Sequence, residues 1–203
     1  MLLLSAASAE RAVLLLADAT GHGVGPALSV TEVRAMLRMG VRMGARLETI
    51  ASHMNEQLCD DLQGGRFISA WLGDLDAVKG TLTCFSAGQG PVIVYHASTD
   101  TCEVRLGDTR PLGILPALEP KLPEPLVLTR GDVLLVASDG IHEAENRQGQ
   151  RFGIERIEEV VRAHRQDTPG EIIHALRDAV IEFAAGAPAS DDRTMLIIKR
   201  TGR

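Results

Sequence analysis

A strand-like run that ends in a glycine-rich turn is the feature that most constrains this chain. Residues 13–17 are apolar and aliphatic, as in a buried strand, and the run ends on the carboxylate of Asp18. Glycines at every second position of 21–25 permit positive φ, and Pro26 suits the first turn of a helix. A carboxylate beside such a bare turn can hold a cation or a phosphate. The alternative is that Asp18 caps the helix and the glycines form a plain turn.

Two later stretches repeat this pattern. One runs from the apolar residues 133–137 into Asp139 and Gly140, and the other begins with Asp191 and leads into a predicted strand at 194–198. Strands that each carry an aspartate at one tip can bring their carboxylates to one edge of a sheet. Mg²⁺ and Mn²⁺ favour that all-oxygen environment. The three stretches together predict a divalent-metal site, although Asp139-Gly140 alone is also a common turn sequence.

Four short motifs, in this order along the chain, are similar to those of a known family. They are D-x-x-G-H-G from Asp18, A-G-x-x-P from Ala87, S-D-G from Ser138 and D-D-x-T from Asp191. The ordered set resembles the metal-dependent PPM-type protein serine/threonine phosphatases, in the bacterial SpoIIE/RsbU-like branch. The likeness runs from about residue 13 to residue 199, which is nearly the whole chain.

The resemblance implies hydrolysis of phosphoserine or phosphothreonine by a water that two metal ions activate. It implies that Asp18 bridges both ions and that the backbone carbonyl of Ala19 ligates one of them. Asp139 and Asp191 are then expected to hold the second ion. The ions expected are Mn²⁺ or Mg²⁺. Asp192 is expected to lie behind the ligands, because the wider family often has a neutral residue there.

The resemblance also implies partners. The expected substrate is a small phosphorylated regulatory protein, such as an anti-sigma-factor antagonist. We expect an upstream sensor or regulator to shift the helices predicted within residues 26–62 and so to switch metal occupancy. A pseudophosphatase, which binds a partner without turnover, is the alternative function. A nucleotide phosphate loop at residues 21–25 is a weaker interpretation, because the segment lacks the Gly-Lys-Ser/Thr of a P-loop.

Two positions depart from the family pattern. Gln89 stands where the branch usually has a histidine. Such phosphatases also carry a Gly-Asp segment on a strand before the first motif, and the 17 residues that precede Asp18 contain none. The domain is therefore expected to lack its N-terminal strand or strands and to bind one of its two ions weakly. His22 is interpreted as a turn residue rather than as a general acid.

Hydrophobic periodicity indicates a single α+β domain over residues 1–203. The strands predicted between residues 67 and 106 are interpreted as an antiparallel meander, and a capping box at Thr168 starts the last helix. Five of the nine prolines lie between Pro111 and Pro125, which predicts a constrained surface flap. The resemblance implies the same architecture, a four-layer α-β-β-α sandwich of two mainly antiparallel sheets flanked by helix pairs. Helices are predicted at 26–43, 47–62, 152–165 and 169–183, and strands at 67–75, 81–86, 92–96, 101–106, 126–128 and 133–137.

Composition excludes several classes of protein. A hydrophobic content of 45% and a charged content of 24% are those of an ordinary globular protein. The net charge of −6 argues against a nucleic-acid partner, which normally leaves a basic face. No segment approaches the ~20 apolar residues that span a bilayer. The three widely spaced cysteines predict reduced thiols and, with the missing span, a cytoplasmic protein without membrane partners.

Overall fold

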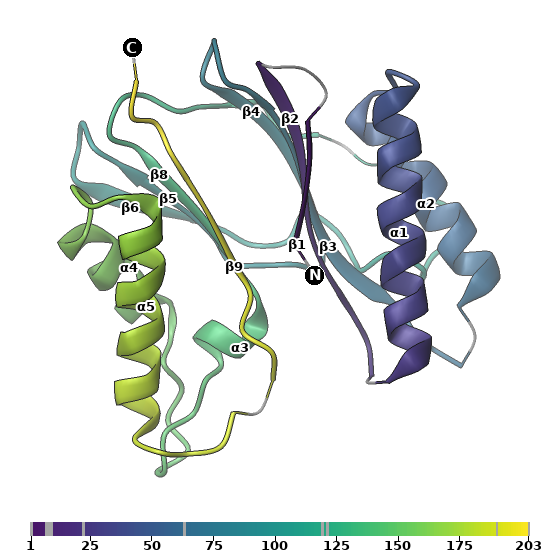
Figure 1. Ribbon diagram of the computed structural model, residues 1–203. Helices are drawn as coiled ribbons and strands as arrows, with labels where there is room; N and C mark the ends of the chain where they lie inside the picture. The colour runs from purple at the N-terminus through teal and green to yellow at the C-terminus, as the bar shows by residue number, and fades with distance from the viewer. Residues whose placement is uncertain are drawn as a thin grey trace. The chain divides into compact units, whose positions relative to one another are not determined.

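Figure 1 shows the computed structural model of the chain. It describes residues 2–6 (main chain only), 10–21, 23–62, 64–118, 120, 122–189 and 191–202. The chain divides into two compact units, and each unit combines two separate stretches of sequence. Unit 1 contains residues 1–89 and 107–127, and unit 2 contains residues 90–106 and 128–203.

Unit 1 is an antiparallel sheet with two helices on one face. The helices α1 (Val24–Arg42) and α2 (Leu47–Asp61) lie against this sheet (Figure 1). Leu37 of α1 and Met54 of α2 share one buried cluster with Leu15 and Phe85 of the sheet. In spatial order, the strands are β1 (Leu2–Ala6), β2 (Arg11–Ala19), β3 (Ile68–Asp76), β4 (Thr81–Ala87) and β7 (Leu126–Val127).

Unit 2 has the same kind of arrangement around a second antiparallel sheet. Helices α4 (Ile154–Ala163) and α5 (Pro169–Ala184) cover one face, and the short helix α3 (Asp139–His142) follows β8. Ile93 and Leu135 of the sheet share a buried cluster with Ile157 and Leu176 of the helices. In spatial order, the strands are β6 (Thr101–Arg105), β5 (Val92–His96), β8 (Val133–Ala137) and β9 (Met195–Lys199).

The predicted α+β class, with two mainly antiparallel sheets flanked by helix pairs, is confirmed. β5 and β8 have the predicted bounds, and α1 begins two residues before its predicted start. The capping box of α5 is also confirmed. The Thr168 hydroxyl accepts the N–H of Glu171 at 3.4 Å, and the Glu171 carboxylate accepts the N–H of Thr168 at 2.8 Å. That the whole chain is one domain stays a prediction.

The predicted meander over residues 67–106 is wrong, because its strands belong to two different sheets. β3 pairs with β4 in unit 1, whereas β5 pairs with β6 in unit 2. The change of sheet falls at Gly88, whose φ of +71° lies outside the strand region. A Cβ added at Gly88 would lie 2.5 Å from the ring of Pro111. Nearby Pro91 has no N–H to offer a continuing ladder.

The proline-rich segment, predicted to be a constrained surface flap, is exposed at residues 114–117 and is anchored on α2. Leu112 is fully buried in the core of unit 1. The buried side chain of Asn55 donates to the carbonyls of Leu115, at 2.7 Å, and Pro116, at 3.4 Å. It also accepts the N–H of Gly113 at 3.0 Å. One amide side chain therefore holds the start of the segment.

β1 is an element that the sequence did not predict. It pairs antiparallel with β2, with Leu2 opposite Leu16 and Ala6 opposite Ala12. The expected lack of a Gly-Asp strand is not tested by this pairing and stays a prediction. The three cysteines are free thiols, as predicted. Among the helices of the described ranges, none is both long and apolar enough to cross a bilayer.

Replacing the buried Asn55 with alanine should destabilise unit 1 by about 1–3 kcal/mol, because three main-chain groups of the proline-rich segment lose their partner. Urea denaturation measures the loss, and hydrogen exchange should locate it at residues 112–118. Gln57→Ala is the matched control on α2, since the exposed Gln57 side chain donates to Asp61 of the same helix. Equal destabilisation by the two variants would contradict the anchoring role of Asn55.

Candidate active site

Asp18 and Ala19 form the end of β2. The five residues before Asp18 are buried and Asp18 itself is exposed, so the strand carries the carboxylate out of the core. Thr20 extends the pairing with the chain that leads into β3. Its N–H donates to the carbonyl of Phe67 at 3.0 Å, and its hydroxyl accepts the N–H of Phe67 at 3.1 Å. Pairing with β3 and with the segment that leads into it therefore fixes the main chain both before and after Asp18.

The turn that follows uses its glycines as predicted. Gly21 and Gly23 have φ values of +90° and +95°, which other residues rarely adopt. Gly23 is the N-cap of α1, which begins at Val24. The alternative in which Asp18 caps this helix is therefore wrong. His22, interpreted as a turn residue, lies outside the described residues.

In unit 2 the structure brings two acidic turns into contact, one at Asp139 and Gly140 and the other at Asp191 and Asp192. Asp139 begins α3 directly after β8, and Asp191 precedes β9, which is the neighbour of β8 in the sheet. A Cβ added at Gly140 would lie 2.3 Å from the carbonyl oxygen of Asp192 and 3.2 Å from that of Asp191. Glycine is required at position 140 because the main chains of the two turns touch there.

Ser138 ties the same two turns together. Its N–H donates to the carbonyl of Thr194 at 2.9 Å. Its buried hydroxyl donates to the carbonyl of Asp192 at 3.0 Å and accepts the N–H of Thr194 at 2.9 Å. Asp139, Asp191 and Asp192 are all exposed. The two turns therefore form a fixed main-chain frame whose carboxylates face outward.

Sequence reasoning missed an indirect link between the A-G-x-x-P motif and Asp18, which runs through the hydroxyl of Ser69. Ser69 lies opposite Asp18 in β3, and its hydroxyl is 3.4 Å from the Asp18 carbonyl oxygen. The same hydroxyl is 3.2 Å from Oε1 of the buried Gln89. A hydroxyl has one proton, so it donates to one of these oxygens at a time. Gln89 thus has a structural role next to the end of β2, and only the strand register reveals it.

The donor set fits a hard divalent cation, because Mg²⁺ and Mn²⁺ prefer carboxylate and carbonyl oxygens. Asp18 and Ala19 belong to unit 1, whereas Asp139 and Asp191 belong to unit 2. Within the part of the chain that the structure describes, no group of three or more His, Cys, Asp or Glu side chains could hold a metal ion. The assignment of these four residues as metal ligands stays a prediction.

Solved structures place the fold in a known class. The chain is similar to the SiaA-PP2C domain of Pseudomonas aeruginosa, with a TM-score of 0.83 and 20% identity, over 98% of this chain and 79% of that one. It is also similar to RsbX in complex with magnesium, with a TM-score of 0.70 and 14% identity, over 97% of this chain and 84% of that one. The chain therefore has the fold of a PP2C-type phosphatase domain.

The sequence narrows this class to a family. Residues 8–201 match the family model of stage II sporulation protein E (SpoIIE), and the chain belongs to this family. It is 21% identical over 189 residues to phosphoserine phosphatase RsbU of Bacillus subtilis (strain 168), which covers 92% of this chain and 55% of RsbU. The chain thus spans about half the length of that relative. The PPM-type, SpoIIE/RsbU-like resemblance of the four motifs is confirmed.

Gly140→Ala should force the two acidic turns of unit 2 apart. Overpacking of this kind costs about 1–3 kcal/mol, because the obstacle is a main-chain carbonyl and not a movable side-chain end. Thermal unfolding measures the change. In the control Gly170→Ala the added Cβ has no described atom within 4 Å, so α5 should keep or gain stability. A melting temperature of Gly140→Ala equal to that of the wild type would show that the close approach does not hold the turns.

Proposed function

We propose that this chain is a metal-dependent phosphatase that hydrolyses phosphoserine or phosphothreonine on a small regulatory protein, such as an anti-sigma-factor antagonist. The observation that carries the proposal is the contact between two acidic turns, which Ser138 and Gly140 hold together in unit 2. Membership of the SpoIIE family supports the same reaction class, and the relative RsbU bears the name phosphoserine phosphatase.

In this proposal Asp18, Ala19, Asp139 and Asp191 hold two Mn²⁺ or Mg²⁺ ions. Asp18 would bridge both ions and Ala19 would ligate one through its carbonyl, while Asp139 and Asp191 would hold the second. The proposal is supported by the exposure of all three carboxylates at strand ends. The magnesium complex of the structurally similar RsbX supports a hard divalent ion.

When bound, the ions supply an activated water and neutralise charge on the phosphoryl oxygens. The residues of the chain supply the geometry. Hydrogen bonds from Ser138 to the main chains of Asp192 and Thr194 set the separation of the two turns of unit 2. Thr20 secures Asp18 by extending the pairing beyond β2. Ligands held in this way lose little conformational freedom when they bind.

Asp139→Asn tests the metal assignment. The change removes a charge and keeps the size, so Mn²⁺ affinity should fall by at least about tenfold while circular dichroism stays unchanged. Calorimetry with Mn²⁺ gives the affinity. The control is Asp178→Asn, which neutralises an exposed carboxylate on α5 that pairs with Arg177 at 2.8 Å. Unchanged Mn²⁺ affinity in Asp139→Asn would exclude Asp139 as a ligand.

Turnover separates the enzyme from the pseudophosphatase. The wild-type chain should hydrolyse para-nitrophenyl phosphate and a phosphoserine peptide in the presence of Mn²⁺, and Asp139→Asn should lose most of this activity. Mn²⁺ binding without turnover of either compound would favour a binding module that keeps the fold without the reaction.

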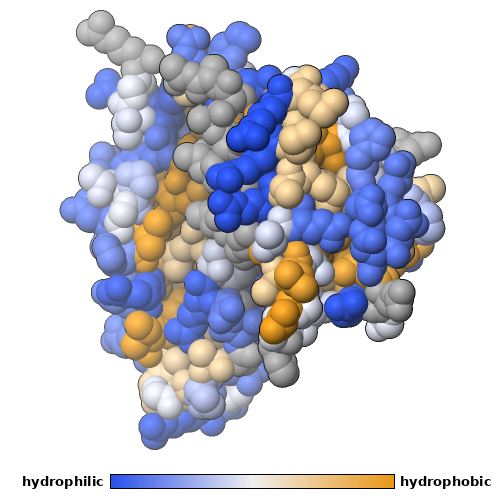
Figure 2. Space-filling model, turned by 45° about the vertical axis from the view of Figure 1, so that its right-hand side comes forward, coloured by the Kyte–Doolittle hydropathy of each residue, from blue (hydrophilic) through white to orange (hydrophobic). Residues whose placement is uncertain are grey.

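We also propose that α1 receives a regulatory partner. Val24, Leu28 and Met39 are 76%, 65% and 55% exposed. Their spacings of four and eleven residues place them on one face of α1. Figure 2 brings the side of Figure 1 that carries α1 and α2 forward and shows hydrophobic residues at the surface among hydrophilic ones. Exposed apolar groups gathered on one face are typical of a binding surface. A shift of α1 would reach Asp18 through the short glycine turn.

The double variant Leu28→Ser with Met39→Ser tests this surface. It should keep Mn²⁺-dependent turnover of para-nitrophenyl phosphate, because neither side chain is buried in the core of unit 1. It should lose the response of phosphatase activity to the regulatory partner. Arg34→Ser, an exposed change on another face of α1, is the control. Regulation that stays the same in the double variant would rule out this face of α1 as the regulatory contact.

A further inference from the structure

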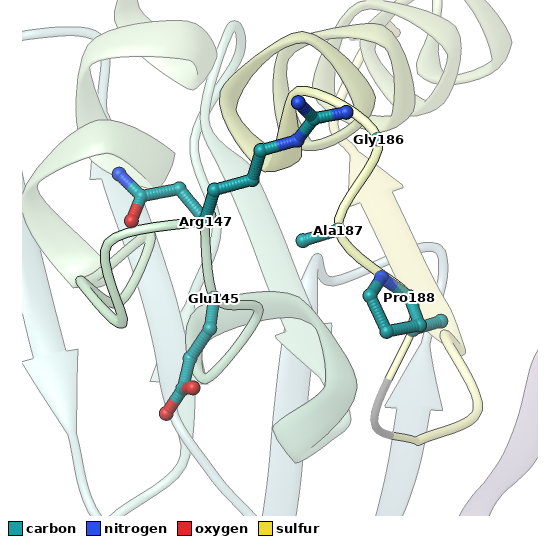
Figure 3. Close-up of a pocket in the computed structure, with 7 residues that line it drawn as sticks. Glu145, Arg147, Gly186, Ala187 and Pro188 are labelled. Atoms are coloured by element: carbon teal, nitrogen blue, oxygen red, sulfur yellow. The ribbon is translucent and has the colours of Figure 1, made fainter.

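A pocket of about 510 Å³ lies between two loops of unit 2 (Figure 3). One wall is formed by residues 145–147 after α3, and the other by residues 186–189 after α5. The first loop begins six residues after Asp139, and the second ends two residues before Asp191. Along the chain, the pocket therefore adjoins both of the proposed metal ligands of unit 2.

Hydrogen bonds hold both walls of the pocket in place. Oδ1 of Asn146 accepts the N–H groups of Gln148 and Gln150, each at 3.0 Å. On the other side, the N–H of Ala187 donates to the carbonyl of Ala184 at 2.8 Å. A preformed pocket loses little entropy when a ligand occupies it, as in most binding sites.

The pocket has a charged wall and an apolar wall. Figure 3 shows Arg147 reaching toward Gly186, while Glu145 points the other way. Ala187 and Pro188 lie across from them on the second loop. Nη2 of Arg147 is 3.1 Å from the place that a Cβ of Gly186 would take. The cation and the anion thus lie toward opposite ends of the pocket.

Arg147 is the group in this pocket that suits an anionic ligand. Within the described ranges its guanidinium makes no hydrogen bond or ion pair, whereas the nearby Arg151 pairs with Glu143 at 2.7 Å. A guanidinium presents a planar set of donors that matches a carboxylate with two parallel hydrogen bonds. A peptide segment beside the scissile phosphate must pass close to the metal ligands, and this pocket adjoins two of them along the chain.

We propose that the pocket is a substrate subsite for residues that flank the phosphoserine, with an acidic side chain of the substrate on Arg147. The proposal rests on the proposed phosphatase function and names the feature of the substrate that this chain selects. Ala187 and Pro188 cover the aliphatic part of the bound segment. Glu145 disfavours a second acidic residue at its own end of the pocket.

A purely structural role for Arg147 makes a different prediction. The last turn of α5, described throughout, contains no basic residue, and a cation near a helix C-terminus is stabilising. In that case the loss of Arg147 would lower the melting temperature and leave substrate preference unchanged.

The experiment measures kcat/KM with Mn²⁺ for para-nitrophenyl phosphate and for phosphoserine heptapeptides. The heptapeptides differ in carrying Glu, Ala or Lys at one flanking position. The wild type should prefer Glu over Lys at one or more positions by about three- to fivefold, the scale of a partly exposed ion pair. Arg147→Gln should remove this preference, with little change in the turnover of para-nitrophenyl phosphate.

Two further variants sharpen the result. Gln148→Glu makes the same change in net charge at the next residue of the loop, which does not line the pocket, and should keep the preference. Ala187→Phe fills the pocket and should raise KM for all heptapeptides without slowing the turnover of para-nitrophenyl phosphate.

The outcomes separate the subsite from the phosphatase activity. Dephosphorylation of the heptapeptides without a preference for Glu over Lys in the wild type would overturn the subsite alone. A preference that survives Arg147→Gln would do the same. Unchanged preference with a lower melting temperature would assign Arg147 to the end of α5 instead. A wild-type chain without Mn²⁺-dependent turnover of any of these compounds would overturn the proposed function, and the subsite with it.

Discussion

The close approach of Gly140 to the main chain of Asp192 is the contact on which the candidate site depends. The pairing of β8 with β9 places Ala137 opposite Met195, so the chain leaves β8 and enters β9 at the same end of the sheet. Ser138 then bonds across the gap, and the absent side chain at Gly140 lets the two turns touch. Backbone contacts of this kind are stiff, because main-chain atoms cannot move apart through a change of side-chain rotamer.

The same principle governs the end of β2 in unit 1. The strand is buried from Val13 to Ala17, and the bonds between Thr20 and Phe67 continue its pairing past the exposed Asp18. In both units the main chain is fixed and the carboxylate is exposed. Carboxylates that converge repel one another until a cation joins them. A stiff frame bears that repulsion better than a mobile loop would.

Features set by short stretches of sequence were predictable. The bounds of β5 and β8, the positive φ of Gly21 and Gly23, and the capping box of α5 all follow from a few neighbouring residues. The four motifs also led to the family. Glycine is needed at position 140 because of Asp192, more than 50 residues away, so the local Asp-Gly pattern could not reveal the reason.

Features set by pairing between distant segments were not predictable. Local periodicity cannot say that β4 and β5 enter different sheets, that Ser69 lies opposite Asp18, or that Asn55 holds the proline-rich segment. The pocket beside Arg147 likewise depends on two loops about 40 residues apart meeting in space. Each of these contacts requires the register of strands or the packing of helices, which the order of residues alone does not disclose.

The order in which the strands of unit 2 leave the ribosome has a consequence for the nascent chain. Unit 1 ends at residue 127. The sheet of unit 2 cannot be completed before β9 is made, and β9 is synthesised after the three other strands of that sheet. Synthesis runs from the N-terminus, so all of unit 1 has been made while most of unit 2 is still unmade. The frame around Ser138 cannot close before residue 194 has emerged. A nascent chain that has not yet reached residue 191 therefore carries Asp18 and Asp139 without Asp191, so the acidic frame of unit 2 is the last part of the candidate site to form.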